Sequence, residues 1–156
     1  MNTGFYENRE AENATLASAG MKEEIHAFIA ETQKEKPFLP AGVDLASYLD
    51  KLFAHAVIIP FLEKGCIKGV IAFYCNDLEN KRAFFSMLAV AADQRRRGVG
   101  YFLMETAFRF SKLNGCDTVE ADVYKDNIES FKMCEKLGFA IKEDKGDFYV
   151  LQKLLD

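Results

Sequence analysis

The run from Gln94 to Gly100 places three consecutive arginines before a Gly-Val-Gly turn, and it constrains the fold more than any other part of the chain. An apolar segment, residues 83–90, precedes the run and favours a strand. From Val99 onward, apolar side chains recur at helical spacing until Asn114-Gly115, a pair typical of a helix end. The expected order is therefore a strand, a basic glycine-containing turn and a helix.

This order of elements predicts a site for a phosphate-bearing ligand. The first N–H groups of a helix have no partner within the helix, and the helix dipole favours negative charge at that end. Glycine lets a phosphate come close to the backbone, and arginine donates forked hydrogen bonds to phosphate oxygens. Because the whole chain has a formal net charge of -4, the arginines form a local basic spot, which suits a small anionic ligand better than a nucleic acid.

Length and composition narrow the class of protein. A chain of 156 residues with a hydrophobic share of 49% predicts a single domain, residues 1–156, with a substantial core. The cysteines are scattered without a C-x-x-C pair and no histidine lies near them in sequence, which predicts reduced thiols and no metal site. No apolar run is long enough to span a bilayer, and the N-terminus lacks a signal-peptide pattern. We therefore expect a cytoplasmic protein that binds neither membranes nor nucleic acid.

The N-terminal part of this domain, residues 1–55, is expected to be helical. A short helix is expected at Ala11–Ser18, followed by an amphipathic helix at Met21–Lys34. A second amphipathic helix is expected at Leu45–His55, where the side chain of Asp44 can cap the first turn. Both amphipathic helices are expected to turn their apolar stripes toward the core.

The remaining residues, 56–156, predict a mixed sheet with two further helices. An antiparallel meander comes first, then strand, helix, strand and helix, and a hairpin closes the chain, which is an α/β architecture. Asp126-x-x-Glu129 has the form of a capping box for the second helix, and Gly138 ends that helix. The expected strands are Ala56–Leu62, Ile67–Cys75, Arg82–Val90, Thr118–Tyr124, Ala140–Lys142 and Phe148–Leu154, and the expected helices are Val99–Leu113 and Asn127–Leu137.

Two motifs, each at the start of an expected helix, are similar to those of a known family. The first is Arg95–Gly100, which matches the pattern R/Q-x-x-G-x-G/A and follows Leu88-Ala89-Val90 on the preceding strand. The second runs from Asn127 to Phe139 and ends in Glu-Lys-Leu-Gly-Phe. From Ala54 to the C-terminus, the chain resembles the GNAT superfamily of acyl-CoA-dependent N-acyltransferases.

The resemblance implies the transfer of an acetyl group from acetyl-CoA to an amine of a small molecule or peptide, by direct attack in a ternary complex. It implies a GNAT-like fold, no metal, and an acyl-CoA and a small amine acceptor as partners; a homodimer is left open. The backbone of Leu88 and Val90 would pair with the pantetheine arm like an added strand, and residues 96–101 would hold the pyrophosphate. The implied cofactor contacts are Leu88, Val90, Arg95, Arg96, Arg97, Gly98, Val99, Gly100, Tyr101, Asn127 and Ser130.

At one position the chain departs from the family pattern. Many members have a tyrosine that is assigned to protonating the departing CoA thiolate, and this chain has Cys134 there. A thiol has a lower reference pKa than a tyrosine hydroxyl, so Cys134 can serve as the acid. Because Cys134 also shares a helical stripe with Phe131 and Leu137, it can instead be a small buried side chain. Disulfide chemistry with CoA is a third alternative.

One expected strand has carboxylates on its polar face. Because alternate side chains of a strand share a face, Glu120, Asp122 and Tyr124 lie together. An amine that arrives protonated must lose a proton before it attacks, so Glu120 and Asp122 are the candidate general bases. A solvated edge or pairing with lysines would equally explain these carboxylates. Tyr74 and Ser86 are further candidates.

Other functions stay open beside the enzyme. A regulatory or sensor domain that binds acyl-CoA without turnover is favoured by the missing tyrosine. A dinucleotide-binding domain is disfavoured, because the expected strands are antiparallel and Tyr101-Phe102-Leu103 follows Gly100 without a third glycine. A covalent cysteine mechanism is disfavoured, because no histidine is placed in sequence to activate a thiol.

Overall fold

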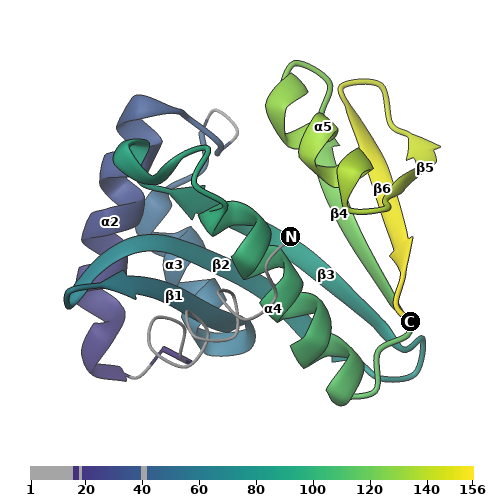
Figure 1. The fold of residues 1–156 in the computed structure, drawn as a ribbon, viewed down its shortest axis with the longest axis horizontal. Helices are drawn as coiled ribbons and strands as arrows, with labels where there is room; N and C mark the ends of the chain where they lie inside the picture. The colour runs from purple at the N-terminus through teal and green to yellow at the C-terminus, as the bar shows by residue number, and fades with distance from the viewer. Residues whose placement is uncertain (1–15, 18, 40–41) are drawn as a thin grey trace. The chain divides into compact units, whose positions relative to one another are not determined.

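A mixed sheet runs through the chain in the computed structural model, which describes residues 16–17, 19–39 and 42–156 (Figure 1). Within these residues the strand order is β1-β2-β3-β4-β6-β5. Strand β3 runs parallel to β4, whereas β6 is antiparallel to both β4 and β5. The strands are β1 (Val57–Glu63), β2 (Cys66–Asp77), β3 (Arg82–Val90), β4 (Thr118–Tyr124), β5 (Ala140–Asp144) and β6 (Phe148–Leu154).

Helices and strands together confirm the predicted α/β fold class. The α-helices of the described residues are α2 (Lys22–Glu35), α3 (Leu45–His55), α4 (Val99–Leu113) and α5 (Ile128–Lys136), with short 3-10 helices η1 (Ala19–Met21) and η2 (Ala92–Gln94). The helix expected at Ala11–Ser18 lies, apart from residues 16–17, outside the described residues. No helix in the described part of the chain is long and apolar enough to cross a membrane.

Local sequence signals account for the ends of several elements. The carboxylate of Asp44 accepts hydrogen bonds from the backbone N–H of Ser47 at 3.1 Å and from its hydroxyl at 2.8 Å, which confirms the predicted cap of α3. Between β1 and β2, Lys64 and Gly65 both have positive φ angles, 52° and 80°. This is the conformation that a tight two-residue hairpin turn requires, so β1 and β2 begin the expected meander.

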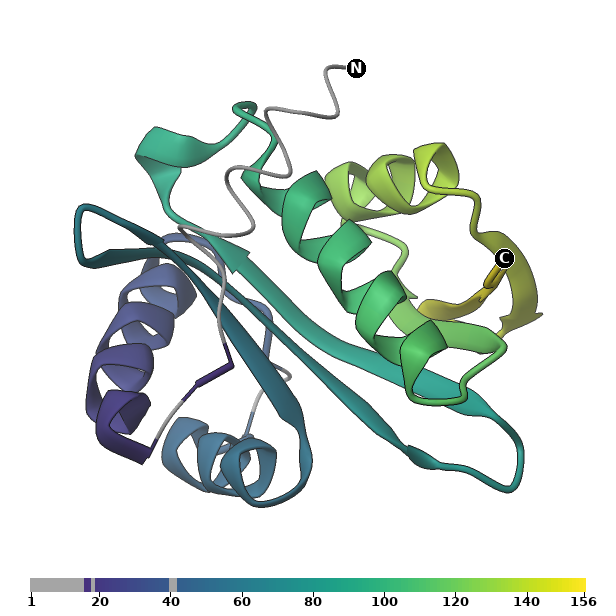
Figure 2. The same cartoon turned by 60° about the horizontal axis from the view of Figure 1, so that its bottom comes forward.

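The contacts divide the chain into two compact units: Met1–Ala72 with Met87–Ala107, and Phe73–Ser86 with Phe108–Asp156. In the first unit, α2 and α3 lie on one face of β1 and β2, and the first turns of α4 lie on the other (Figures 1 and 2). The rings of Phe61 and Phe102 meet edge to face, with centroids 5.6 Å apart. A Cβ atom at Gly69 would lie 3.1 Å from the side chains of Val99 and Leu103, so glycine there lets α4 pack closely on β2.

Phenylalanine side chains that pack against one another form much of the core of the second unit. Ring centroids lie 5.3 Å apart for Phe73 and Phe85, 5.4 Å for Phe85 and Phe108, and 5.9 Å for Phe108 and Phe139. Aromatic pairs at these separations add to the stabilisation from burial. The phenylalanine-rich composition therefore has a structural role in this core.

Helix α5 covers one face of the C-terminal strands. The rings of Phe131 on α5 and Tyr149 on β6 lie 5.6 Å apart. On β4, Val119, Ala121 and Val123 are buried, whereas Asp122 and Tyr124, which alternate with them, are exposed. The strand therefore separates an apolar face from a polar face, as the sequence predicts.

Candidate functional site

The loop between β3 and α4 presents unpaired backbone N–H groups. Arg96 has a φ of 66° and Gly98 a φ of 85°, both in the left-handed region. The first backbone hydrogen bond of α4 runs from the N–H of Phe102 to the carbonyl of Gly98, at 2.9 Å. The N–H groups of Arg96 and of residues 98–101 make no hydrogen bond within the described part of the chain. A left-handed turn followed by a helix start is the arrangement that binds anions in proteins.

The side chain of Arg95 binds this loop to neighbouring parts of the first unit. Its Nε donates to the carbonyl oxygen of Val90 at 3.2 Å, and its guanidinium lies 3.6 Å from the carboxylate of Glu35 on α2. By contrast, Arg96 and Arg97 are exposed. Arg95 therefore ties the loop to the end of β3 and to α2, while its two neighbours extend toward solvent.

The start of the loop is anchored to β2. The N–H of Ala91 donates to the carbonyl of Lys68 at 2.9 Å, and the Lys68 ammonium pairs with Asp93 at 3.1 Å. These contacts hold the backbone where it leaves β3. Because Ala91, Asp93 and Arg95 are all tied to neighbouring elements, the backbone of the loop is held in place before any ligand binds.

Strand β3 pairs with β4 along its first part, Arg82–Phe85. Residues 87–90 of β3 belong to the first unit, where β2 is the neighbouring strand, and they lie beyond the residues that pair with β4. Leu88 and Val90, the predicted backbone contacts of the pantetheine arm, lie on this last part of β3 and are partly exposed. A strand edge can pair with an extended ligand through its N–H and C=O groups.

In the second unit, Asn127 caps the start of α5. Its side-chain oxygen accepts a hydrogen bond from the N–H of Ser130 at 3.2 Å, and its own N–H donates to the carbonyl of Tyr124 at 3.0 Å. The prediction that Asp126 caps this helix is therefore wrong by one residue, because Asn127 occupies the cap position. The proposed cofactor residues Asn127 and Ser130 are thus hydrogen-bonded to each other.

Glu120 lies buried between two cations. Only 8% of its surface is exposed, and its carboxylate accepts hydrogen bonds from Lys142 at 2.8 Å and Arg82 at 3.3 Å. Burial alone would raise the pKa of Glu120, but the hydrogen bonds and charges of Lys142 and Arg82 outweigh it and lower this pKa. Arg82 also donates to Asp77 at 3.0 Å. Glu120 is therefore held ionised within an ion-pair network.

Asp122, two residues along the same face, has the opposite shift. Although Asp122 is exposed as a residue, partial desolvation of its carboxyl and, secondarily, the negative charge of Glu120 raise the pKa of Asp122, while Lys145 opposes this shift. A carboxylate with a raised pKa is a stronger base than an ordinary one. The two carboxylates of β4 thus differ: two cations hold Glu120 ionised, whereas the pKa of Asp122 is raised.

We predict that Glu120→Gln destabilises the protein by about 1–2 kcal/mol at pH 7, because two partly exposed cations lose their shared carboxylate. A carboxyl whose pKa is lowered on folding stabilises above its ordinary pKa of 4.5, and this contribution is lost as the pH falls through the folded value. The difference between wild type and variant should therefore be largest near neutral pH and shrink in acid. Urea unfolding at a series of pH values measures it.

The exposed Glu105 on α4 provides the matched control for this prediction. Glu105→Gln removes the same charge without touching the network, so its unfolding free energy should stay close to that of the wild type. Equal stability of Glu120→Gln and wild type at pH 7 would contradict the prediction.

Cys134 lies on the buried side of α5. Its exposed fraction is 6%, and burial raises the pKa of its thiol to about 11. Its backbone carbonyl accepts hydrogen bonds from the N–H groups of Leu137 and Phe139, which close the end of the helix. The thiol therefore stays protonated near neutral pH, in apolar surroundings.

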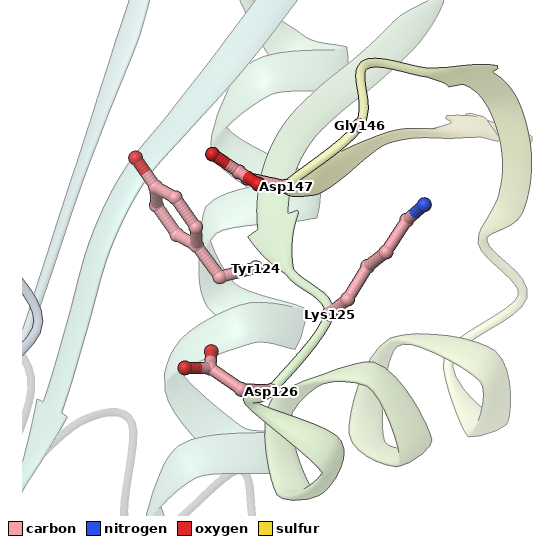
Figure 3. Close-up of a pocket in the computed structure, with 5 residues that line it drawn as sticks. All are labelled: Tyr124, Lys125, Asp126, Gly146 and Asp147. Atoms are coloured by element: carbon pink, nitrogen blue, oxygen red, sulfur yellow. The ribbon is translucent and has the colours of Figure 1, made fainter.

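A pocket with a volume of about 360 Å³ lies where β4 ends, beside the β5–β6 turn. Figure 3 shows the side chains of Tyr124, Asp126 and Asp147 on one side of it and Lys125 extending the opposite way. The Lys125 ammonium pairs with Asp144 at 2.8 Å. The side of the pocket with the two carboxylates is therefore the acidic one.

Sequence reasoning missed several residues around this polar face. Lys142 and Arg82 do not belong to any sequence motif. They lie beside Glu120 because of the register in which the strands of the sheet pair. Asp147 belongs to a hairpin turn, where a carboxylate is ordinary. The alternation of side chains along β4 is the one sequence feature that points to Lys142 and Arg82. It places the Glu120 carboxylate on an inward face, and a buried carboxylate needs a cation or a hydrogen-bond donor beside it.

Solved structures of other proteins share this fold. The PaiA N-acetyltransferase from Thermoplasma acidophilum, in complex with coenzyme A, has a TM-score of 0.75 at 15% sequence identity, covering 90% of this chain and 97% of that chain. YncA from Salmonella typhimurium, with its cofactor acetyl-CoA, has a TM-score of 0.74 at 17% identity, covering 92% and 93% of the two chains. Tetrahymena GCN5 has a TM-score of 0.70 at 21% identity, covering 92% and 95%.

No match was found among curated protein sequences. The profile of one protein family, however, matches most of the sequence and includes the loop before α4. This profile describes the acetyltransferase (GNAT) family and matches residues 21–139, so the resemblance is confirmed and the chain belongs to that family.

Proposed function

We propose that this protein transfers an acetyl group from acetyl-CoA to an amine of a small molecule or peptide, by direct attack in a ternary complex. The observation that carries the proposal is the loop of unpaired N–H groups at Arg96 and residues 98–101 in a chain of the GNAT family. Two proteins of similar fold contain coenzyme A or acetyl-CoA, which supports an acyl-CoA as the donor.

The loop fits the pyrophosphate of acetyl-CoA. Backbone N–H groups at a helix start bind phosphate oxygens, and the exposed Arg96 and Arg97 add positive charge around them. Arg95 positions the loop through Val90 and Glu35. The stretch of β3 at Leu88 and Val90, beyond the residues that pair with β4, suits an extended pantetheine arm. By the family resemblance, Val99, Gly100, Tyr101, Asn127 and Ser130 complete the proposed contacts.

Acetyl-CoA supplies the acetyl group as a thioester, and the protein must deprotonate the acceptor. We assign the general base to Asp122, because its raised pKa makes it a stronger base, whereas Glu120 is committed to Arg82 and Lys142. The ring of Tyr124 and the carboxylates beside it favour a cationic group, which supports an amine as acceptor.

Cys134 is a poor acid for the leaving thiolate. Its pKa of about 11 exceeds the reference value of about 8.5 for a thiol, so proton transfer to a thiolate is uphill. We therefore predict that Cys134→Ala keeps kcat within about threefold of the wild type, since it removes only a buried thiol. Steady-state kinetics check this. A loss of kcat of about 100-fold, with the variant folded, would restore the acid role.

A screen for released thiol tests the proposed function. Acetyl-CoA is offered with sugar amines, polyamines, amino acids, aminoglycosides and peptides with free N-termini, and free CoA is measured with a thiol reagent. We expect acceptor-dependent release of CoA with at least one class. The buried Cys134 favours the alternative of a sensor domain, which would bind acetyl-CoA in the same loop and release no CoA with any acceptor.

A further inference from the structure

Two cysteine thiols that lie 41 positions apart in the sequence are in contact in the second unit. The Sγ atom of Cys75, near the end of β2, is 3.3 Å from the Sγ atom of Cys116, which precedes β4. Cys116 is fully buried, whereas Cys75 is partly exposed. No sequence motif predicts this pair of cysteines, because only the folding of the chain brings the two thiols together.

The backbone around Cys116 is fixed by hydrogen bonds on both sides. Its own N–H donates to the carbonyl of Ser111 at 2.9 Å, and the N–H of Asp117 donates to the carbonyl of Lys81 at 2.7 Å. Cys75 lies within β2, so its backbone is held by the sheet. A disulfide requires the sulfurs at about 2.05 Å, and the two Sγ atoms lie 3.3 Å apart, in contact, before any bond forms.

We propose that Cys75 and Cys116 form a redox-active dithiol, which a hydroperoxide converts into an intramolecular disulfide. The sulfur of Cys75 attacks a peroxide oxygen, the O–O bond breaks, and the sulfur is oxidised to a sulfenic acid as the first water leaves. The sulfur of Cys116 then attacks the sulfur of Cys75, the S–O bond breaks, and the second water leaves. Two thiols and one hydrogen peroxide give one disulfide and two waters, and the thiol protons end in the waters.

Exposure sets the order of these two steps. Peroxide can reach Cys75, which is partly exposed, whereas Cys116 is screened from solvent. Burial also raises the pKa of the Cys116 thiol, followed in effect by its hydrogen bond with Cys75. Cys75 is therefore the oxidised residue and Cys116 the resolving residue, placed in contact with it.

The disulfide would join the end of β2 to the start of β4. Strand β4 continues into Glu120 and Asp122, the carboxylates of the polar face. The bond would close a loop through the chain between the two cysteines, which restricts the unfolded state. Oxidation should therefore raise the melting temperature of the wild type by roughly 5–10 °C.

The test uses the full chain, reduced and then exposed to hydrogen peroxide. Remaining thiols are alkylated, and peptides are analysed by mass spectrometry without reduction. We expect a crosslinked peptide pair containing Cys75 and Cys116, a mass loss of two hydrogen atoms, and alkylated Cys66 and Cys134. A thiol reductant should restore all four thiols.

Two variants make the test specific. Cys66→Ser removes an exposed thiol outside the pair and should leave the crosslink intact. Cys116→Ala removes the resolving thiol, so a sulfenic acid should accumulate on Cys75 and be trapped by a cyclic diketone. Sulfinic acid on Cys75 in the wild type without a crosslink, a crosslink to any other cysteine, or a lower melting temperature after oxidation would overturn the proposal.

Discussion

Gly98→Val is expected to weaken the binding of acetyl-CoA at least tenfold while the protein stays folded. Gly98 has a φ of 85°, which a residue with a branched side chain adopts only at a cost of about 1–2 kcal/mol. Relief of this strain turns the peptide units of the loop and moves their N–H groups. Since about 1.4 kcal/mol corresponds to tenfold in affinity, misplacing one or two donors to the pyrophosphate suffices for this loss. Isothermal titration calorimetry measures it.

Gly115, at the other end of α4, is the matched control. It has a φ of 92°, and no atom lies within 4 Å of a Cβ built there, so a side chain meets the same backbone strain in open space. Gly115→Val should lower stability by about 1–3 kcal/mol and leave the affinity for acetyl-CoA unchanged. If Gly98→Val bound acetyl-CoA as the wild type does, the loop would not be the pyrophosphate site.

Asp122→Asn is expected to lower kcat/KM roughly 100-fold at pH 7, the usual effect of removing a general base. The raised pKa of Asp122 also sets the shape of the pH profile. As the pH falls through this pKa, the carboxylate is protonated and can no longer accept the proton of the amine, so wild-type activity declines on the acid side. The variant should lose this acid limb. Steady-state kinetics over a pH series, with the acceptor that the thiol screen identifies, measure both effects.

Glu120→Gln and Asp122→Glu are the controls for this prediction. Glu120→Gln removes a neighbouring carboxylate that is already paired, so the acid limb should persist and shift to lower pH, because the negative charge that raises the pKa of Asp122 is gone. Asp122→Glu keeps a carboxylate and should recover part of the activity. An acid limb unchanged in Asp122→Asn would remove Asp122 from the mechanism.

Helices and strands that begin or end at a capping residue or a glycine could be predicted from the sequence. Asp44 caps α3, and Gly115, with its positive φ, follows the end of α4. The alternation of β4 set its polar and apolar faces correctly. The helix caps and the two faces of the strand depend on residues that are close in sequence. Periodicity and capping rules can therefore predict them.

Contacts set by sheet register could not be predicted. Lys142 reaches Glu120 from β5, where the register shifts between Ile141 and Glu143, and no sequence signal fixes that irregularity. The contact between Cys75 and Cys116 depends on how β2 and the start of β4 are placed. The cap of α5 fell one residue later than predicted, because Asn127 competes with Asp126 for the same position.

We propose above all that the loop before α4 binds the pyrophosphate of acetyl-CoA. The most direct test compares the affinities of acetyl-CoA and S-acetylpantetheine, which carries the same thioester and arm without the pyrophosphate and nucleotide. We predict that S-acetylpantetheine binds at least about 100-fold more weakly to the wild type, and that Gly98→Val reduces this ratio. Equal affinities of the wild type for the two thioesters would contradict the account.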